Sequence, residues 1–232
     1  MENNYTIVKE LTYKGLPVNK GKFNNLDLYE EPLEAIHKRI MYVSEKYTRI
    51  YIYRFDVTLP DSINKSDIDV NVSLSEAIQN TVKHLKVKTK SKTNTFRNHK
   101  TVSYLWVKED DTGTKREGEK EKGIHYHGFF VLSGHSVRFS GENDFELYAI
   151  LNKYWKNACL KNHSAEGGYV SPSEGNDVPV FIDFDGVTRK PKDKSHQKKL
   201  EKAFFALSYL AKTNTKVITK GKKLYSGNQL NS

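Results

Sequence analysis

Two apolar segments separated by a charged one constrain the fold of this chain more than any other feature. The first is TVSYLWVKE at residues 101–109, and the second is GIHYHGFFVL at residues 123–132. Both are rich in β-branched and aromatic residues, as strands are. The segment between them, DDTGTKREGEKEK, is charged and contains glycine, so it suits a solvated connection. The pattern predicts an antiparallel hairpin with an extended polar tip.

Two histidines lie two residues apart in the second strand. Side chains two apart point to the same face, so His125 and His127 share one face, and Ile124 and Tyr126 turn to the other. Two imidazoles on one face can bind a metal ion. The chain has 8 histidines, however, so a pair at this spacing also arises by chance and the bare motif is weak.

A carboxylate at the end of the first strand strengthens the metal interpretation. Glu109 would lie at the edge where the two imidazoles begin, giving a mixed nitrogen and oxygen site that suits Mg²⁺ or Mn²⁺ and would also take Zn²⁺ or Co²⁺. Asp56, in the apolar segment RFDV, is the competing third ligand. The alternative for Glu109 is an exposed charge at a strand end.

Further periodic segments predict the remaining elements. Leu33 and Ile40 belong to a helical apolar spacing, and Ser73 with Glu76 forms a capping-box start for a basic helix. Strands and helices do not alternate as parallel βαβ units would, so we expect one α+β domain with a largely antiparallel sheet and helices packed on it. In chain order, the other predicted elements are a helix over 26–47, a strand over 51–60, a helix over 73–90, a helix over 144–160, a strand over 178–186 and a helix over 196–216.

The charge balance favours a polyanionic partner. Among 232 residues there are 38 Lys and Arg against 28 Asp and Glu, a formal net charge of +10. Nucleic acid is the commonest partner of such a surface, although a merely soluble basic protein has the same composition. The single Cys159 excludes an internal disulfide and a cysteine-rich zinc site. Because no apolar signal or membrane-spanning run is present, we expect a cytoplasmic protein without a membrane partner.

A tyrosine and a lysine in the last predicted helix form a second candidate group. Leu200, Ala203, Phe204, Leu207 and Ala211 would form the buried stripe of that helix, and Tyr209 falls opposite to it. Packing does not explain this tyrosine. Lys212, three residues on, could assist it as a nucleophile by stabilising charge. Other candidate nucleophiles are Tyr154, Tyr169 and Tyr225, none of which has a lysine three residues later.

Several stretches together resemble a known enzyme group, the HUH endonucleases, and within it the replication proteins of filamentous phages and prophages (the inovirus type). In this sequence they are RFDVTLP at 54–60, YLWVKE at 104–109, HYHGFFVLSGH at 125–135, NKYW at 152–155 and SYLAKTNTK at 208–216. The resemblance spans residues 50–226. Phe205 and Thr213 stand one helical turn either side of Tyr209, so the resemblance is to single-tyrosine members.

The resemblance implies a fold and a domain organisation. The fold would be an RRM-like antiparallel palm, the HUH endonuclease fold, with a C-terminal helix that bears the tyrosine. Residues 50–226 would form this domain, preceded by an irregular and helical extension over 1–49 and followed by a tail over 227–232.

The resemblance also implies residue roles and a reaction. Glu109, His125 and His127 would bind Mn²⁺ or Mg²⁺, Tyr209 would be the nucleophile and Lys212 its charged helper. The protein would nick single-stranded DNA at a replication origin, with or without a hairpin, in the cytoplasm of a bacterial host. It would form a 5′-phosphotyrosine and start rolling-circle replication with a host helicase and polymerase as further partners. The residues expected to contact DNA are Arg54, Lys216, Lys220, Lys222 and Lys223.

Three alternatives remain at the level of sequence. A relaxase or transposase would share the same chemistry. A non-catalytic DNA-binding or regulatory protein on an RRM-like sheet would explain the basic charge and the aromatic content equally well. A metal hydrolase could use activated water, with Tyr209 as a bystander.

Overall fold

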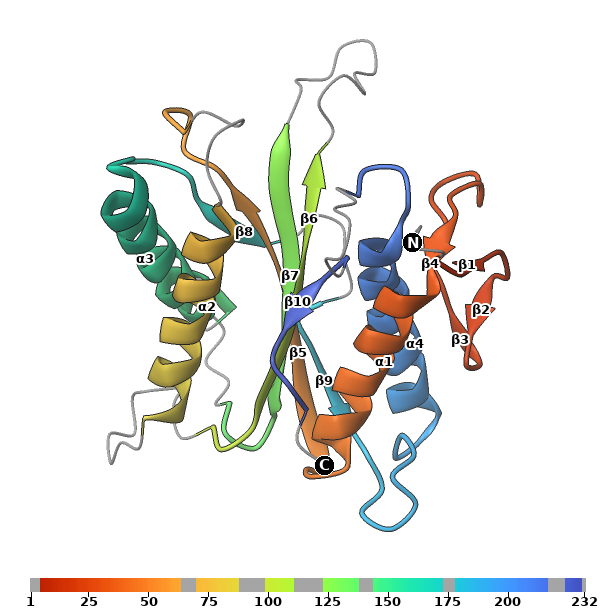
Figure 1. Cartoon of the computed structure of the whole chain (residues 1–232). Coiled ribbons are helices and arrows are strands. Elements are labelled where there is room, and N and C mark those ends of the chain that lie inside the picture. The colour runs from red at the N-terminus through yellow and green to blue at the C-terminus, as the bar shows by residue number, and fades with distance from the viewer. Residues whose placement is uncertain are drawn as a thin grey trace.

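A mixed sheet-and-helix architecture is seen in a computed structural model of the chain, which describes residues 5–63, 70–87, 99–110, 123–137, 144–172, 178–216 and 224–230. Six strands form its main sheet (Figure 1). Their bounds are β5 Arg49–Thr58, β6 Val102–Asp110, β7 Ile124–Ser133, β8 Val170–Pro172, β9 Val180–Asp183 and β10 Ser226–Gly227.

The strands pair antiparallel in the order β10-β6-β7-β5. The outer edge of β5 pairs with β9 along its first half and with β8 along its second half. The predicted hairpin is therefore confirmed as β6 and β7, which pair from Val102 opposite Leu132 to Asp110 opposite Ile124. Its predicted polar tip lies outside the described residues.

Two layers of helices cover the sheet. Helices α1 (Glu30–Ser44) and α4 (Lys194–Ser208) lie on one face, and α2 (Val70–Lys86) and α3 (Asp144–His163) lie on the other (Figure 1). Ile50 and Ile52 of β5 join the core under α1 and α4, whereas Tyr51 and Tyr53 join the core on the opposite side. Burial on both faces explains why the strands read as nearly continuous apolar runs. The described fold is thus α+β with a mainly antiparallel sheet, as predicted.

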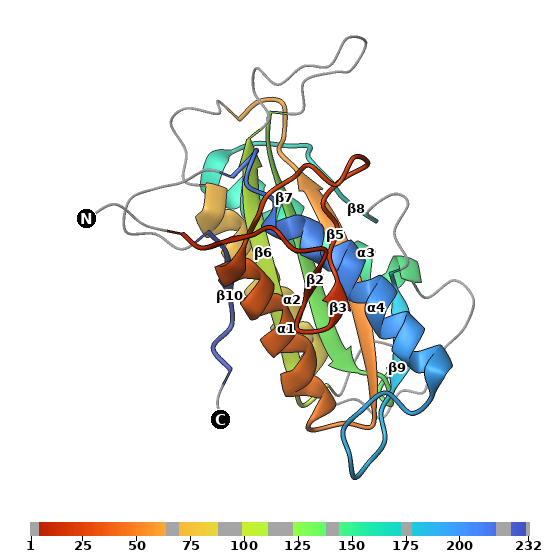
Figure 2. The same cartoon turned by 90° about the vertical axis from the view of Figure 1, so that its right-hand side faces the viewer.

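The N-terminal residues share the core under α1 and α4. They form two small antiparallel pairs, β1 (Ile7–Val8) with β4 (Leu28–Tyr29) and β2 (Thr12–Tyr13) with β3 (Leu16–Pro17). Leu16 and Leu28 are buried in that core. Figure 2 shows these strands beside α1 and α4, over the same face of the sheet. The described part of the predicted extension, residues 5–48, therefore packs against the sheet.

The first predicted helix agrees closely with α1. All four residues of its apolar spacing are fully buried, namely Leu33, Ile36, Ile40 and Val43. The strands expected over 51–60 and 178–186 and the helix over 144–160 correspond to β5, β9 and α3 with shifted ends.

Two predicted details of the helices are wrong. Ser73 does not cap its helix, because α2 already includes Val70, and the Ser73 hydroxyl is paired with Nε2 of His163 at 2.8 Å. The last α-helix ends at Ser208, not at 216. It is followed by a 3₁₀ turn, η1 (Tyr209–Ala211), so Tyr209 lies at the end of the helix. The chain then leaves helical geometry because Lys212 forms a bridge with Leu28 of β4.

No helix among the described residues is both long and apolar enough to span a bilayer.

Candidate metal centre

The candidate site is built where three neighbouring strands expose polar side chains to the face covered by α1 and α4. Strand register sets Glu109 of β6 opposite His125 of β7, and His127 of β7 opposite Asp56 of β5. Alternation along β7 sends both histidines to the face that Phe129 and Val131 share, and Tyr126 to the opposite core. The predicted common face of His125 and His127 is therefore confirmed.

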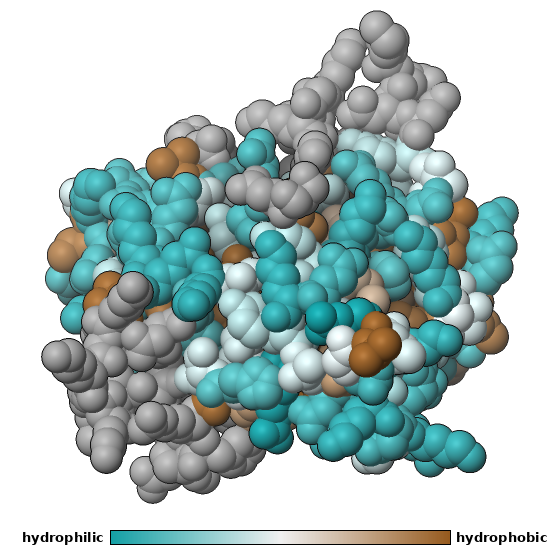
Figure 3. Space-filling model, turned by 90° about the horizontal axis from the view of Figure 1, so that it is seen from below, coloured by the Kyte–Doolittle hydropathy of each residue, from teal (hydrophilic) through white to brown (hydrophobic). Residues whose placement is uncertain are grey.

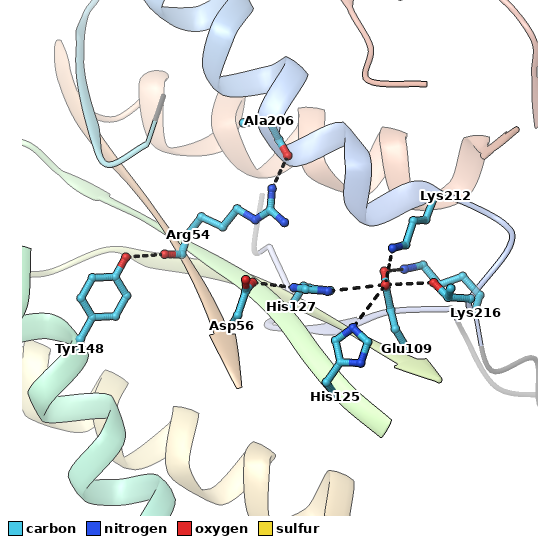
Figure 4. A network of polar contacts seen from close by, with 10 residues as sticks. Arg54, Asp56, Glu109, His125, His127, Tyr148, Ala206, Lys212 and Lys216 are labelled. Atoms are coloured by element: carbon cyan, nitrogen blue, oxygen red, sulfur yellow. Dashed lines mark hydrogen bonds and ion pairs between the residues drawn. The ribbon is translucent and has the colours of Figure 1, made fainter. Parts of the chain in front are cut away.

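The side chains of Glu109, His125 and His127 point toward one another (Figure 4). Oε2 of Glu109 lies 3.8 Å from Nε2 of His125 and 3.5 Å from Nε2 of His127. One ligand atom from each residue lies within 4.8 Å of the others, and all three side chains are buried. Two imidazole nitrogens and a carboxylate oxygen at this separation could hold a divalent cation.

In each imidazole, Nδ1, the nitrogen that faces away from Glu109, is held by an oxygen atom of a neighbouring residue. Nδ1 of His125 lies 2.8 Å from the carbonyl oxygen of Gly123, and Nδ1 of His127 lies 2.5 Å from Oδ1 of Asp56. Each Nδ1–H can donate to its oxygen, which leaves both Nε2 atoms directed at Glu109. Asp56, the competing third ligand in the sequence, thus lies behind the His127 ring, on the side away from Glu109. Outer partners of this kind orient metal-binding histidines.

Three groups that follow α4 contact the Glu109 carboxylate. The Lys212 ammonium lies 2.8 Å from Oε2, the Thr215 hydroxyl donates to Oε2 at 2.9 Å, and the Lys216 ammonium is paired with Oε1. Burial alone would raise the pKa of Glu109. The charges of Lys216, His127 and Lys212 instead hold that pKa well below its usual range, so the carboxylate is ionised.

Lys216 is a buried part of this group. Its side chain is 1% exposed, and burial lowers its pKa to about 8 even though Glu109 acts in the opposite direction. Its backbone also bridges Glu109, and the amide of Asp110 donates to the carbonyl of Thr215 at 2.9 Å. The chain after α4 is therefore attached to the end of β6 by both backbone and side chains.

Tyr209 lies beside the same group. Its side chain is partly exposed, and Nζ of Lys212 lies 4.2 Å from the centre of its ring. Burial lowers the pKa of Lys212, but Glu109 and then the Tyr209 phenol act the other way and leave it raised. Lys212 is thus a charged ammonium between the tyrosine and Glu109. Lys212 therefore contacts a residue of each predicted group, Glu109 of the metal ligands and the candidate nucleophile Tyr209.

Comparison with known proteins places the chain in a family. The sequence matches the model of the YagK/YfjJ C-terminal domain over residues 10–226. The chain belongs to this family. Searches among curated proteins and among solved structures found no match. The YagK/YfjJ match includes all of the site residues described above and begins well before residue 50, so it also includes α1 and most of the small N-terminal strands.

Two residues expected to contact DNA have other surroundings in this YagK/YfjJ domain. Arg54 is buried beneath α4, where Nη1 donates to the carbonyl of Ala206 at 2.8 Å, and its own carbonyl accepts from the hydroxyl of Tyr148 (Figure 4). The side chain of Lys216 is paired with Glu109 and is buried, whereas contact with a DNA phosphate would require it to lie at the surface. Lys220, Lys222 and Lys223 lie outside the described residues.

Thr215 and the role of Lys216 at Glu109 were missed by sequence reasoning. The only available signal was their place in SYLAKTNTK. A continuous helix would have sent these side chains in other directions. The end of α4 at Ser208 is what brings them to Glu109.

Proposed function

We propose that this YagK/YfjJ domain nicks and rejoins a single DNA strand through a covalent bond to Tyr209, with a divalent metal ion as cofactor. One observation carries the proposal: the Lys212 ammonium contacts Glu109 of the candidate metal centre and also lies over the ring of Tyr209. One fixed positive charge thus lies between the tyrosine ring and a carboxylate of the metal-binding triad.

The metal ligands would be Glu109, His125 and His127. They would hold Mn²⁺ or Mg²⁺, whose charge polarises a phosphodiester and so makes attack by a weak nucleophile feasible. Asp56 would keep His127 in the tautomer that presents Nε2. The remaining chemistry belongs to side chains at the end of α4.

Tyr209 would supply the nucleophile. Its oxygen forms a bond to phosphorus as the bond from phosphorus to the 3′ oxygen breaks, leaving a 5′-phosphotyrosine. The phenolic proton passes to solvent, and the departing 3′ oxygen takes up a proton to become a free hydroxyl. Lys212, whose raised pKa keeps it charged, stabilises the negative charge on the phenolate and the phosphate. Attack by a 3′ hydroxyl on the phosphotyrosine reverses the step and joins the strand.

Such a reaction suits the initiation of rolling-circle replication of a phage, prophage or plasmid-like element, the role that the resemblance to HUH enzymes implies. In this proposal the antiparallel sheet is the RRM-like palm and the end of α4 presents the tyrosine. The substrate is origin DNA, and a host polymerase would extend the 3′ hydroxyl. A relaxase or transposase would use the same residues for the same step.

The deciding experiment is incubation with labelled single-stranded DNA from the element's own origin, with Mn²⁺ or with a chelator, followed by a denaturing gel. We expect a protein–DNA band that requires Mn²⁺ and is lost in Tyr209→Phe. Tyr169→Phe is the matched control, because that tyrosine is 56% exposed and lies on a different segment, so its loss should leave the band unchanged.

Two other outcomes would replace the proposal. Metal-dependent cleavage that leaves no protein on the DNA and survives Tyr209→Phe would indicate hydrolysis by activated water. Binding of origin DNA without cleavage or adduct would indicate a DNA-binding protein.

A further inference from the structure

The outer face of α4 carries a regular row of residues that continues to Tyr209, the first residue of η1. The row consists of Lys194, Lys198, Lys202, Phe205 and Tyr209, at spacings of four, four, three and four residues. At about 100° per residue, these five side chains fall within an arc of about 80°. The opposite side of the helix is the buried one, with Leu200, Ala203, Phe204 and Leu207 in the core. We call the five residues the α4 row.

The row is accessible and carries one sign of charge. Lys194, Lys198 and Lys202 are exposed, and Phe205 is 42% exposed although it is a large apolar side chain. Glu201, the one acidic residue of α4, falls about 20° outside this arc and accepts a hydrogen bond from Gln197 at 2.8 Å. Packing explains neither the exposed aromatic ring nor its position between the lysines and the tyrosine.

The charge of the α4 row favours a polyanionic partner. In Figure 2, α4 crosses in front of the sheet, and β3 contacts it. The lower end of the molecule, a different side from the outer face of α4, is mostly hydrophilic with scattered hydrophobic residues (Figure 3). Three lysines in a row on a chain of formal net charge +10 complement a polyanion.

We propose that the α4 row binds the single DNA strand on one side of the phosphate that reaches Tyr209. The proposal rests on the proposed function, because it takes Tyr209 as the point of attack. From residue 194 to residue 209, along α4 and into η1, the chain rises about 22 Å, which corresponds to about six phosphates of a stacked strand. The lysines would contact phosphates, and Phe205 would stack on a base next to the reacting phosphate.

Binding is measured by fluorescence anisotropy with labelled single-stranded DNA, in a Tyr209→Phe background so that no adduct forms. The test variant combines Lys194→Gln, Lys198→Gln and Lys202→Gln. The matched control combines Lys83→Gln, Lys153→Gln and Lys156→Gln, three exposed lysines of α2 and α3 on the other side of the sheet. Both variants remove three charges, so only the position of the lost charges differs.

We expect the α4 variant to bind about tenfold more weakly than its control at moderate salt. Its plot of log affinity against log salt should be shallower by about 2, because each lost contact with a single strand removes about 0.7 from that slope. Phe205→Ala should weaken binding about fivefold or more, and Phe205→Tyr, which can still stack, should restore it. Equal affinity of the two triple variants, with Phe205→Ala unchanged, would overturn the proposal.

The direction of the strand gives a second measurement. The row lies on one side of Tyr209, so shortening the DNA on one flank of the cleavage position should erase the difference between the triple variants. Shortening the other flank should preserve this difference in affinity. If shortening either flank removed the difference, the proposal would be contradicted.

Failure of this inference is distinguishable from failure of the proposed function. If the protein with Tyr209 forms the adduct while the two triple variants bind alike, the function stands and the α4 row is not the binding surface. If the α4 variant loses binding while no adduct forms with Tyr209 present, the row binds DNA and the proposed reaction is wrong.

Discussion

Nδ1 of His127 lies 2.5 Å from Oδ1 of Asp56, and the two residues stand directly opposite each other on β7 and β5. Burial would lower the pKa of His127, but Asp56 and Glu109 act in the opposite direction and leave it raised. The same contact keeps Nε2 of His127 directed at Glu109, 3.5 Å away. Asp56 therefore acts on the candidate metal centre through His127.

Replacing Asp56 should weaken metal binding without abolishing it. We expect Asp56→Ala to lower the affinity for Mn²⁺ by about 10–100-fold in isothermal titration calorimetry, the typical effect of losing an outer partner. Asp56→Asn, whose amide oxygen can still accept from Nδ1, should lose less. Glu45→Gln, an exposed acidic residue at the end of α1, is the control for the change in net charge.

The same titration separates the two candidates for the third ligand. If Asp56 were the ligand, Asp56→Ala would abolish binding and Glu109→Gln would leave it nearly intact. The geometry predicts the reverse, because Oε2 of Glu109 is the carboxylate oxygen that faces both Nε2 atoms.

Lys216 should stabilise the fold through its ion pair with Glu109. Removing one partner of a buried pair typically costs about 3–5 kcal/mol. We expect Lys216→Met to lower the free energy of unfolding by about 2 kcal/mol in urea, less than that range because Lys212 and Thr215 still contact Glu109. The double variant with Glu109→Gln should recover most of the loss, as a double-mutant cycle reveals. Additive losses would contradict a direct coupling of Lys216 to Glu109.

The parts of the site that sequence predicted are those set by local pattern. Glu109 and His125 belong to a hairpin whose two strands follow each other in the chain, so strand ends and alternation sufficed to bring them together. The position of Asp56 behind His127 depends on the register between β5 and β7, which lie 71 residues apart at this contact. Nothing local fixes such a register.

The end of α4 was the least predictable feature. Apolar spacing continues through Leu207 and Ala211, which favours one long helix up to residue 216. The chain leaves helical geometry there because it pairs with distant segments: Lys212 bridges Leu28, and Lys216 bridges Glu109. The apolar spacing of a helix depends only on residues close together in the sequence. These contacts join residues more than 100 positions apart, so the spacing cannot predict them. The contacts of Lys216 and Thr215 with Glu109 follow from that ending.

Gly128 leaves room for an aromatic ring next to the metal-binding strand. A Cβ atom at this position would lie 2.4 Å from Cζ of Phe55 and 3.0 Å from the carbonyl oxygen of Leu105. Phe55 is fully buried, so its ring cannot move aside easily. We expect Gly128→Ala to lower the free energy of unfolding by about 1–3 kcal/mol in a urea titration, as overpacking does. Gly186→Ala, where the nearest atom, Cγ2 of Thr48, would be 3.5 Å away, is the control and should change the free energy of unfolding little.

His99 should make the fold sensitive to mild acid. It is fully buried, and burial lowers its pKa from 6.5 to about 4. Between these two values the unfolded chain binds the proton and the folded chain does not. The contribution of His99 is therefore complete above pH 6.5 and is lost as the pH falls toward 4, by roughly 3 kcal/mol in total. Urea titrations from pH 7 to pH 4 should show a shallower decline for His99→Gln than for the unchanged protein. All other groups titrate in both proteins, so the difference between the two plots of unfolding free energy against pH isolates the effect of His99. Parallel plots would show that the His99 ring takes up a proton in the folded protein without destabilising it.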